Sequence, residues 1–240
     1  MYRERESATG GVVWTGAGEA DGLHRVMPDG CMDLVWDGGG LLAAGPDTAA
    51  YFADWGPGAV YVGLRLPPGT GPAALGVPAH ELRDRRVPLE DLWSTDEARR
   101  LGEKVALAAD PGAPLERAAA RRIAASGGTD PVMREVAALL GAGASVARAA
   151  ETTGLSPRHL HRRSLAAFGY GPRTLGRILR FERALAAART GTPFAEVAAA
   201  AGYADQAHLA REARELAGDP LSVLTGRAGR AGGAGRPVSR

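Results

Sequence analysis

The sequence predicts an α+β protein: a small β-rich, barrel-like domain over residues 1–93, a helical linker over 94–128 and an all-α domain over 129–227. Two patterns carry this prediction. Apolar and polar residues alternate in short stretches of the first part, which is typical of strands. In the last part, apolar residues recur at helical spacing, and a pattern of two short helices occurs twice. Residues 228–240 are rich in Gly and Arg and are expected to be disordered.

The first part contains two stretches that alternate as strands do. In residues 31–36, one face would carry Met32, Leu34 and Trp36, and the other Cys31, Asp33 and Val35. The following Asp37-Gly-Gly-Gly40 predicts a turn into a strand at 41–44, and therefore a hairpin. A further strand is expected at 60–66, with valines and leucines on one face and Tyr61 and Arg65 on the other.

Helical segments are expected to follow these strands. Short pieces are predicted around 72–75, 78–82 and 89–93. Ser94-Thr-Asp-Glu97 has the spacing of a capping box and predicts that a linker helix begins there. A second linker helix is expected at 115–125, and the sequence leaves open whether the pair dimerises or packs on the first part.

The pattern of two short helices occurs at an interval of about 48 residues. The first copy begins at Ser145 and the second at Phe194. In each copy, a helix with small apolar residues ends near a Gly, a bulky residue follows, and a second helix carries Leu-x-Arg. This order of elements is typical of a helix-turn-helix unit.

Each copy has residues suited to its turn and to the cap of its second helix. Gly154 and Gly202 stand where the chain must reverse, which favours a positive φ that Gly adopts readily. Leu155 and Tyr203 follow them and are expected to lie between the helices. Ser156 in the first copy, and Asp205 in the second, are expected to cap the next helix.

The second helix of each copy is predicted to have a basic outer face. Leu160 faces inward, which leaves Arg158, His161 and Arg162 outside, and Arg211 holds the place equivalent to Arg162. An outward Arg on such a helix fits the major groove of DNA. The alternative is a helical bundle whose Arg residues are only solvated. That alternative could account for a single Arg-rich helix, but it does not explain why the same pattern occurs twice.

Residues from about 129 to 227 resemble the DNA-binding domain of AraC/XylS-type transcription regulators. The resemblance lies in Gly154-Leu-Ser-Pro-Arg-His-Leu-His-Arg-Arg163, in Phe168-Gly-Tyr-Gly-Pro172 and in Gly202-Tyr-Ala-Asp-Gln-Ala-His-Leu209. The family usually has Phe two residues after each Arg of the pair Arg162 and Arg211. This chain has Ser164 and Ala213 at these positions. Each helix-turn-helix unit therefore lacks one large apolar side chain in its expected core.

The resemblance implies a regulator of transcription that binds double-stranded promoter DNA through both units, with RNA polymerase as a partner if it activates. The DNA-binding residues that it implies are Arg158, His161, Arg162, Arg163, Gln206, Ala207, His208 and Arg211. Residues 172–189 are expected to form the connecting helix, roughly 27 Å long at 1.5 Å per residue. Such a rod would hold two recognition helices about one DNA turn, roughly 34 Å, apart.

Charge is divided unevenly along the chain. The whole chain carries a formal charge of +2. Residues 129–240 have sixteen Arg against nine Asp or Glu, which gives +7, and residues 1–128 have thirteen basic against eighteen acidic, which gives −5. A basic half attached to an acidic half is expected of a DNA-binding module joined to a control domain.

The single cysteine and the lack of a long apolar run restrict the class of protein. One Cys excludes an internal disulfide and a cysteine-rich zinc site, and it fits a reducing cytosol. The first six residues lack the apolar core of a signal peptide, and no run of eighteen apolar residues occurs. Together with the resemblance, this predicts a bacterial cytoplasmic protein that is not an enzyme and has no cofactor or metal.

The first part resembles, less specifically, the sensor domains that precede the DNA-binding half in the same family. The phrase His24-Arg-Val-Met-Pro-Asp-Gly-Cys-Met-Asp-Leu-Val-Trp36 carries this resemblance. Cys31, Asp33 and Arg65 are candidates for an effector pocket, and a surface ion pair of Asp33 with Arg65 is the alternative. A small-molecule effector and a second copy of the chain are therefore partners to test, and the sequence does not identify the effector.

Two other functions are compatible with parts of the sequence. Cys31 would suit a thiol-dependent enzyme or an alkylation or redox sensor, although a strand Cys usually only packs. A helical adaptor that does not bind DNA is disfavoured by the charge division. A metal site with His24 and His80 has no favourable ligand spacing.

Overall fold

The computed structural model describes residues 2–18 and 23–227, and the predicted tail at 228–240 lies outside them. The chain forms two compact units, Met1–Leu179 and Arg180–Arg240. Their boundary falls inside one helix, α7 (Pro172–Arg189), so the predicted all-α domain has residues in both units.

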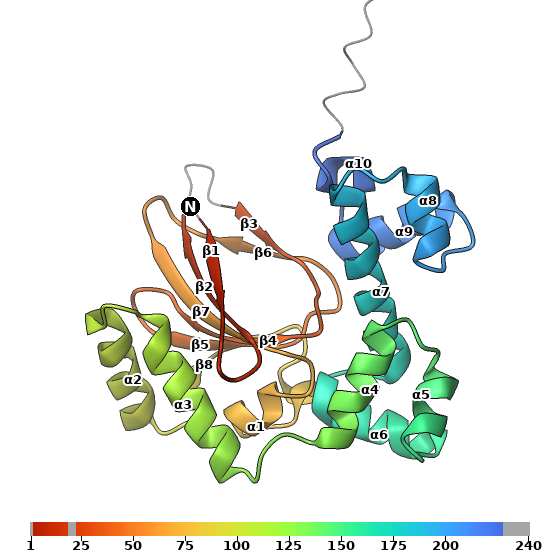
Figure 1. Ribbon diagram of the computed structural model, residues 1–240. Helices are drawn as coiled ribbons and strands as arrows, with labels where there is room; N and C mark the ends of the chain where they lie inside the picture. The colour runs from red at the N-terminus through yellow and green to blue at the C-terminus, as the bar shows by residue number, and fades with distance from the viewer. Residues whose placement is uncertain (1, 19–22, 228–240) are drawn as a thin grey trace, which may run out of the picture. The chain divides into compact units, whose positions relative to one another are not determined.

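The strands all lie in residues 1–93 and make two antiparallel sheets (Figure 1). Their bounds are β1 (Arg3–Glu6), β2 (Val12–Ala17), β3 (Leu23–Val26), β4 (Met32–Trp36), β5 (Leu41–Ala44), β6 (Tyr51–Asp54), β7 (Val60–Leu66) and β8 (Arg86–Pro88). Six strands pair in the order β1-β2-β7-β4-β5-β8, and β3 pairs with β6. The two sheets do not close into a barrel, so the term barrel-like holds only loosely.

The strand predictions are confirmed in position and in facing. β4 and β5 form the expected hairpin, with Trp36 opposite Leu41. On β4 and β7, the side chains predicted for the apolar face lie in one core together with the helices, and Leu34 and Leu64 are almost completely buried. Val60 is the exception: it stands at the first position of β7 and is 52% exposed. The opposite face of the six-stranded sheet carries Trp14, Asp33 and Arg65, and we call it the tryptophan face.

Helices cover the apolar face of the six-stranded sheet (Figure 1). They are α1 (Gly71–Leu75), the short 3-10 helices η1 (Ala79–Glu81) and η2 (Leu89–Asp91), α2 (Thr95–Leu107) and α3 (Gly112–Ala125). The first three correspond to the short helical pieces expected from the sequence. Ser94 caps α2 by accepting a hydrogen bond from the Glu97 amide, as the capping box predicts.

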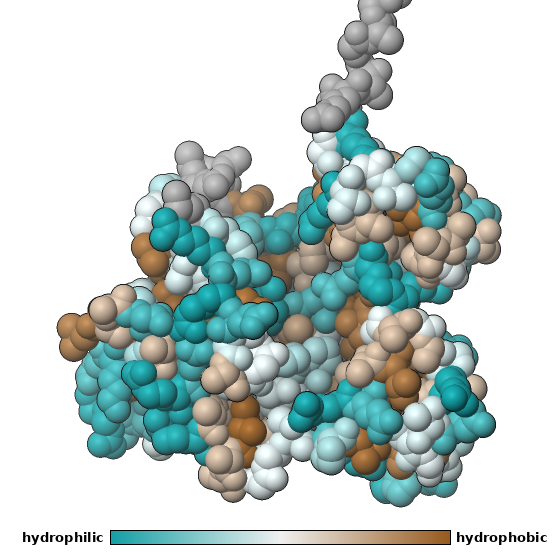
Figure 2. Space-filling model, viewed as in Figure 1, coloured by the Kyte–Doolittle hydropathy of each residue, from teal (hydrophilic) through white to brown (hydrophobic). Residues whose placement is uncertain are grey.

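The two linker helices pack on the sheet of the first part. Leu101 and Val105 of α2 and Leu115 of α3 are buried in the same core as the β7 side chains. The outer side of α2 carries charged residues that pair along the helix, and Figure 2 shows this surface as mostly hydrophilic. Packing on the sheet therefore accounts for the apolar stripe that the sequence left unassigned.

The remaining helices form the all-α part. They are α4 (Pro131–Gly141), α5 (Val146–Thr152), α6 (Pro157–Phe168), α7, α8 (Phe194–Ala200), α9 (Gln206–Ala217) and α10 (Leu221–Leu224). Asp130 caps α4 by accepting hydrogen bonds from the Val132 and Met133 amides, and Met133, Val136 and Leu140 are the buried residues of this helix. Within residues 2–18 and 23–227, no helix is long and apolar enough to cross a membrane.

Candidate functional site

The turns of the two predicted helix-turn-helix units have the same backbone geometry. Gly154 and Gly202 have φ of 66° and 75°. In the first turn, the amide of Leu155 bonds to the Ala150 carbonyl at 3.0 Å, and in the second, the amide of Tyr203 bonds to the Ala198 carbonyl at 2.8 Å. Both turns are thus Schellman motifs, in which a residue with positive φ ends the first helix.

The caps of α6 and α9, the two helices predicted to recognise DNA, also agree with the sequence. The Ser156 hydroxyl accepts a hydrogen bond from the His159 amide, and the Asp205 carboxylate accepts one from the His208 amide. Leu160 and Leu209 face inward and are completely buried. Each unit therefore fixes its second helix by a cap at one end and by a buried leucine on its inner face.

Most of the predicted DNA-binding side chains lie on the outer faces of α6 and α9. The exposed ones are Arg158, His161, Arg162, Gln206, Ala207 and Arg211. Arg162 and Arg211 follow the inward leucines by two residues in both helices, so the equivalence expected from the sequence is present in the structure. Arg162 also contacts the imidazole of His159, one turn earlier on α6.

Two of the predicted DNA-binding residues are engaged within the protein. Arg163 donates to the Asp130 carboxylate at 2.5 Å. Burial raises the pKa of Asp130, but the Arg163 hydrogen bond and charge, together with the bonds from the Met133 and Val132 amides, outweigh burial and lower it. His208 is half-buried, with its ring edge-on to that of Tyr203 at 5.1 Å between centroids. Arg163 thus ties α6 to the start of α4, and His208 packs on the turn of its own unit.

The two positions that depart from the family pattern are in the interior. Ser164 and Ala213 are both completely buried. The hydroxyl of Ser164 has no hydrogen-bond partner among the described residues. Phe168 and Leu216 are buried as well and fill part of the interior, whereas Leu165 is only half-buried.

A family model described as a helix-turn-helix domain matches residues 149–227, which include α6 and α9. This part of the chain is a helix-turn-helix domain, as its motifs predict. A second family model, a domain of unknown function (DUF6597), matches residues 12–88. No curated protein matches the chain.

Several solved structures are similar to this chain. A probable AraC family transcriptional regulator from Rhodopseudomonas palustris is 24% identical over 41% of this chain and 98% of its own, with a TM-score of 0.36. The apo K231A form of ToxT from Vibrio cholerae is 12% identical over 93% of this chain and 99% of its own, with a TM-score of 0.49. ToxT bound to (E)-4-(8-methylnaphthalen-1-yl)but-3-enoic acid is 11% identical over the same shares, with a TM-score of 0.47.

The residues predicted for an effector pocket lie together at the tryptophan face. Asp33 and Arg65 are directly opposite in the β4–β7 register, with 3.9 Å between the Asp33 carboxylate and Arg65 Nε. Arg65 Nε is nearer to Asp29, at 3.3 Å, and the Cys31 amide donates to the same Asp29 carboxylate at 2.8 Å. Asp33 is only 17% exposed and Arg65 31% exposed, so this is a half-buried cluster.

Further charged residues join these at the same face. Arg86 of β8 holds Asp47 through two hydrogen bonds, and Arg65 also reaches Glu4 of β1 at 3.4 Å. The Arg86 guanidinium lies over the ring of Tyr51, 3.9 Å from its centroid. We call this group the charged cluster, and its members are Glu4, Asp29, Asp33, Asp47, Arg65 and Arg86.

Next to the charged cluster, aromatic rings stack on the tryptophan face. Trp55 lies parallel to His24, Tyr61 and Trp14, with centroids 4.1, 4.6 and 5.8 Å away. We call these four residues the aromatic stack. Trp14 also donates its indole N–H to Asp33 at 2.7 Å, which joins the stack to the charged cluster.

Glycines in the strands make room for the aromatic stack. A Cβ added at Gly63 would come within 2.1 Å of the Trp14 ring, and one at Gly16 within 2.5 Å of the Trp55 ring. Sequence reasoning missed the stack and the roles of Asp29, Asp47 and Arg86. A Gly inside an alternating strand often marks a close approach, so Gly63 was the available signal.

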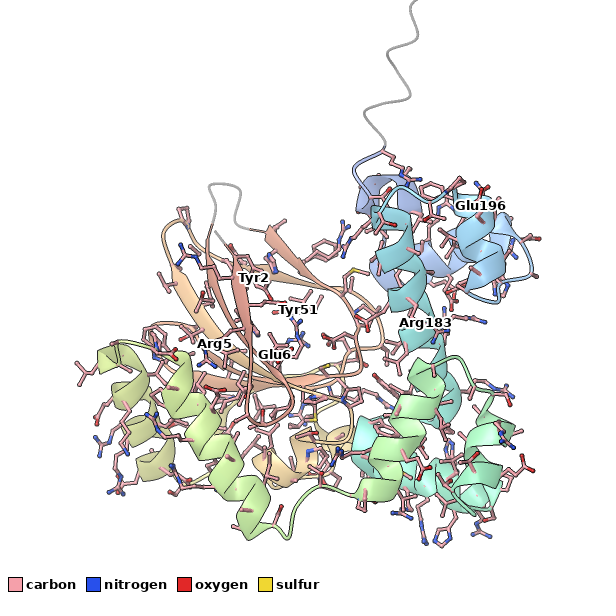
Figure 3. All side chains as sticks on the ribbon, in the orientation of Figure 1. Tyr2, Arg5, Glu6, Tyr51, Arg183 and Glu196 are labelled. Carbon is pink, nitrogen blue, oxygen red and sulfur yellow. The ribbon has the colours of Figure 1, made fainter. Side chains whose placement is uncertain are left out.

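Figure 3 shows how labelled side chains divide between the two faces of the six-stranded sheet. Tyr2 and Tyr51 lie on the side away from α2 and α3, and Arg5 lies toward α3. Arg5 forms ion pairs with Asp110 at 2.8 Å and with Glu116 at 2.6 Å. The first strand therefore has one face tied to the helices and one face turned to the charged cluster.

The surroundings of Cys31 do not favour a thiol-based function. Asp29 and Asp33 flank Cys31, whereas reactive cysteines lie in electropositive surroundings that stabilise the thiolate. Among the described residues, no three His, Cys, Asp or Glu side chains are grouped as a metal site would require.

Proposed function

We propose that the two helix-turn-helix units bind adjacent major-groove segments of one promoter and that the first part of the chain controls this binding. The equivalent, exposed Arg162 and Arg211 carry the proposal, because each sits on a capped helix that follows the same turn. A short helix of this kind, held by a helix-turn-helix scaffold, is the element that enters the major groove.

The outer residues have different parts in this proposal. Arg162 and Arg211 are suited to guanine edges or phosphates, and Arg158, His161 and Gln206 to further bases or the backbone. Ala207 offers only a methyl group, so the second unit would discriminate sequence less. Arg163 would act through Asp130 by keeping α6 in place, and His208 through its contact with Tyr203.

The helix between the units suits binding to a single duplex. α7 has 18 residues, which makes it about 27 Å long at 1.5 Å per residue. One turn of DNA is about 34 Å, so a rod of this size could present two recognition helices to neighbouring groove segments.

The proposed control by the first part rests on two observations. The first part contacts the first helix-turn-helix unit, and its tryptophan face carries the charged cluster. α6 ends beside η1, and Arg83, just after η1, donates to the Gly169 carbonyl at 3.4 Å. Cys31, Asp33 and Arg65 would line the effector site on the tryptophan face. A ligand that changes this face would thereby bias the unit packed beside it.

The DNA proposal is tested by selecting binding sites for the full chain from random duplex DNA. Arg162→Ala and Arg211→Ala should each cost roughly 1–3 kcal/mol of binding free energy on the selected site and relax preference at a few positions. Arg100→Ala, an exposed residue on α2, is the matched control and should change neither.

The spacing of the selected site provides a second readout. Inserting about half a helical turn, roughly 5 base pairs, between the two half-sites should abolish binding by one of the units. Binding and preference that are unchanged by both Arg substitutions would refute the assigned interface. Binding that tolerates every insertion would refute the coupled pair.

A further inference from the structure

The charged cluster holds more negative than positive charge. Its four carboxylates stand against two guanidinium groups, of which Arg86 is occupied by Asp47. Arg65 alone therefore faces the three remaining carboxylates, at 3.3 to 3.9 Å. Among the described residues, two of these negative charges have no cation paired with them when all four carboxyl groups are ionised.

Burial of these carboxylates makes the imbalance costly. The Asp29 and Asp33 side chains are only 22% and 17% exposed. Burial raises the pKa of Asp33 to about 6 and also raises the pKa of Asp29, despite the nearby Arg65. An added positive charge would favour the ionised forms and offset this cost, and the remaining exposure leaves the cluster accessible to solvent.

A buried hydroxyl group beside the cluster lacks a partner. Tyr170, in the loop between α6 and α7, is 3% exposed, and its hydroxyl has no hydrogen-bond partner among the described residues. A Cβ added at Gly30 would lie 3.6 Å from this oxygen, so the hydroxyl is beside Asp29 and Cys31. Burial, followed by the charge of Asp29, raises the pKa of Tyr170, which therefore stays a neutral phenol able to accept or donate a hydrogen bond.

Exposed aromatic rings border the charged cluster. Tyr2 and Tyr51 are 45% and 42% exposed, whereas Trp14 and Trp55 are buried, at 6% and 8%, and Tyr2 stacks over Trp14. Aromatic faces attract cations and pack on flat apolar groups. The buried aromatic stack is joined to the cluster through the bond from Trp14 to Asp33.

Other ligand classes fit this face less well. An anion would have to approach carboxylates, because both guanidinium groups are already paired. A metal ion would need three convergent donors, and the described residues offer no such group. A neutral ligand would leave the excess charge unbalanced.

We propose that the tryptophan face binds a small organic cation, an amine joined to an aromatic or similarly flat group, with Asp29, Asp33 and the Tyr170 hydroxyl receiving its N–H groups. The inference rests on the proposed control through the first part, since it names the ligand class of that site. Tyr170 belongs to the first helix-turn-helix unit, so a cation held there contacts both the first part and the DNA-binding part.

Isothermal titration calorimetry with matched probes tests the charge requirement. The probes are phenethylamine and tryptamine, each compared with its alcohol analogue, which has the same ring and chain but no charge. The amines should bind the full chain saturably, and the alcohols should bind at least about tenfold more weakly, a difference of about 1.4 kcal/mol.

Variants then locate the binding site. Asp33→Asn and Asp29→Asn should each weaken amine binding by about tenfold. Tyr170→Phe should weaken it severalfold, and Asp91→Asn, an exposed position outside the tryptophan face, is the control. Circular dichroism of each variant shows whether it has folded. A folded Asn variant with unchanged amine affinity would overturn the assignment.

The pH dependence of binding supplies an independent readout. The groups around Asp33 are Arg65 on β7, Trp14 on β2, Arg86 on β8 and Asp29 before β4. A cation favours the ionised carboxylate, so amine binding should release protons near pH 6 and strengthen as the pH rises through that value. Binding enthalpies measured in buffers of different ionisation enthalpy report this release, and the alcohols should show none.

The possible failures of the two proposals differ. If neither amine binds at about 10 mM, or if the alcohols bind equally well, the cation proposal is wrong and the DNA-binding proposal is untouched. If the amines bind as expected but leave the affinity for selected DNA unchanged, the ligand class stands and control through the first part is refuted.

Discussion

Arg180 at the centre of α7 pairs with Glu212 of α9, at 3.2 Å between Nη2 and Oε1. Glu212 is only 5% exposed, and the Arg180 guanidinium also lies over the Tyr203 ring, 4.3 Å from its centroid. One arginine thus joins the connecting helix to both the turn and the recognition helix of the second unit. The arrangement explains how a recognition helix that lacks the usual family Phe is held by other contacts.

Removing Arg180 should destabilise the second unit in particular. Arg180→Ala is expected to cost about 3 kcal/mol, because it leaves a buried carboxylate without this partner. Hydrogen exchange of the α8 and α9 amides measures the local opening free energy. Arg189→Met, an exposed position on the same helix, is the control, and equal exchange in the two variants would contradict the assigned role.

The space over Gly63 should be essential to the aromatic stack. Gly63→Ala places a Cβ within 2.1 Å of the Trp14 ring and should cost about 1–3 kcal/mol of the free energy of unfolding. The near-ultraviolet circular dichroism of the tryptophans should change with it. Gly40→Ala has no atom within 4 Å and should leave both unchanged, so equal effects of the two substitutions would be evidence against the stack.

The same substitution at two serines of the first unit should have opposite effects. Ser164→Ala removes a buried hydroxyl without a partner and should stabilise the protein by about 1 kcal/mol. Ser156→Ala removes the cap of α6 and should destabilise it by about 1 kcal/mol. Hydrogen exchange of the α6 amides compares them, and a loss of stability in Ser164→Ala would reveal a partner for that hydroxyl.

The free energy of unfolding of the first part should fall as the pH rises from the ordinary pKa of Asp33 to its pKa in the folded protein. Its pKa is about 6 in the folded protein and 3.8 as the ordinary value, so the folded state binds more protons between these values. The free energy of unfolding should therefore decrease by roughly 2 kcal/mol from pH 4 to pH 7 through this group.

Tryptophan fluorescence during urea unfolding measures this change in the first part, where all four tryptophans lie. Asp33→Asn should flatten the dependence and raise stability at neutral pH. Asp91→Asn should follow the original chain. A profile for Asp33→Asn that is identical to that of the original chain would show that other groups set the dependence.

The local features of this chain were predictable because each depends on a few consecutive residues. Ser94, Ser156 and Asp205 cap helices through side chains that bond three residues ahead, and Gly154 and Gly202 reverse the chain at their own positions. The alternation of residues 60–66 likewise specified that Val62, Leu64 and Leu66 would face the core, although Val60 at the start of the strand is exposed.

The composition of the charged cluster was decided by long-range pairing. Arg65 meets Asp33 because β4 and β7 pair in one register, and Arg86 reaches Asp47 across the sheet edge from β8. Sequence alternation placed Asp33 and Arg65 on one face but contained no information about partners from distant segments. Asp29, Asp47 and Arg86 were therefore missed.

The sequence by itself determined the two helix-turn-helix units and the outward direction of Arg162 and Arg211, because short-range turns, caps and periodicity specify them. Only the tertiary structure decided that Tyr170 would be buried beside Asp29 and that Trp14 would lie over Gly63. Those contacts depend on how the sheet and the helices pack. Packing brings together residues that are far apart along the chain and excludes water from them, and local sequence patterns do not specify which residues meet.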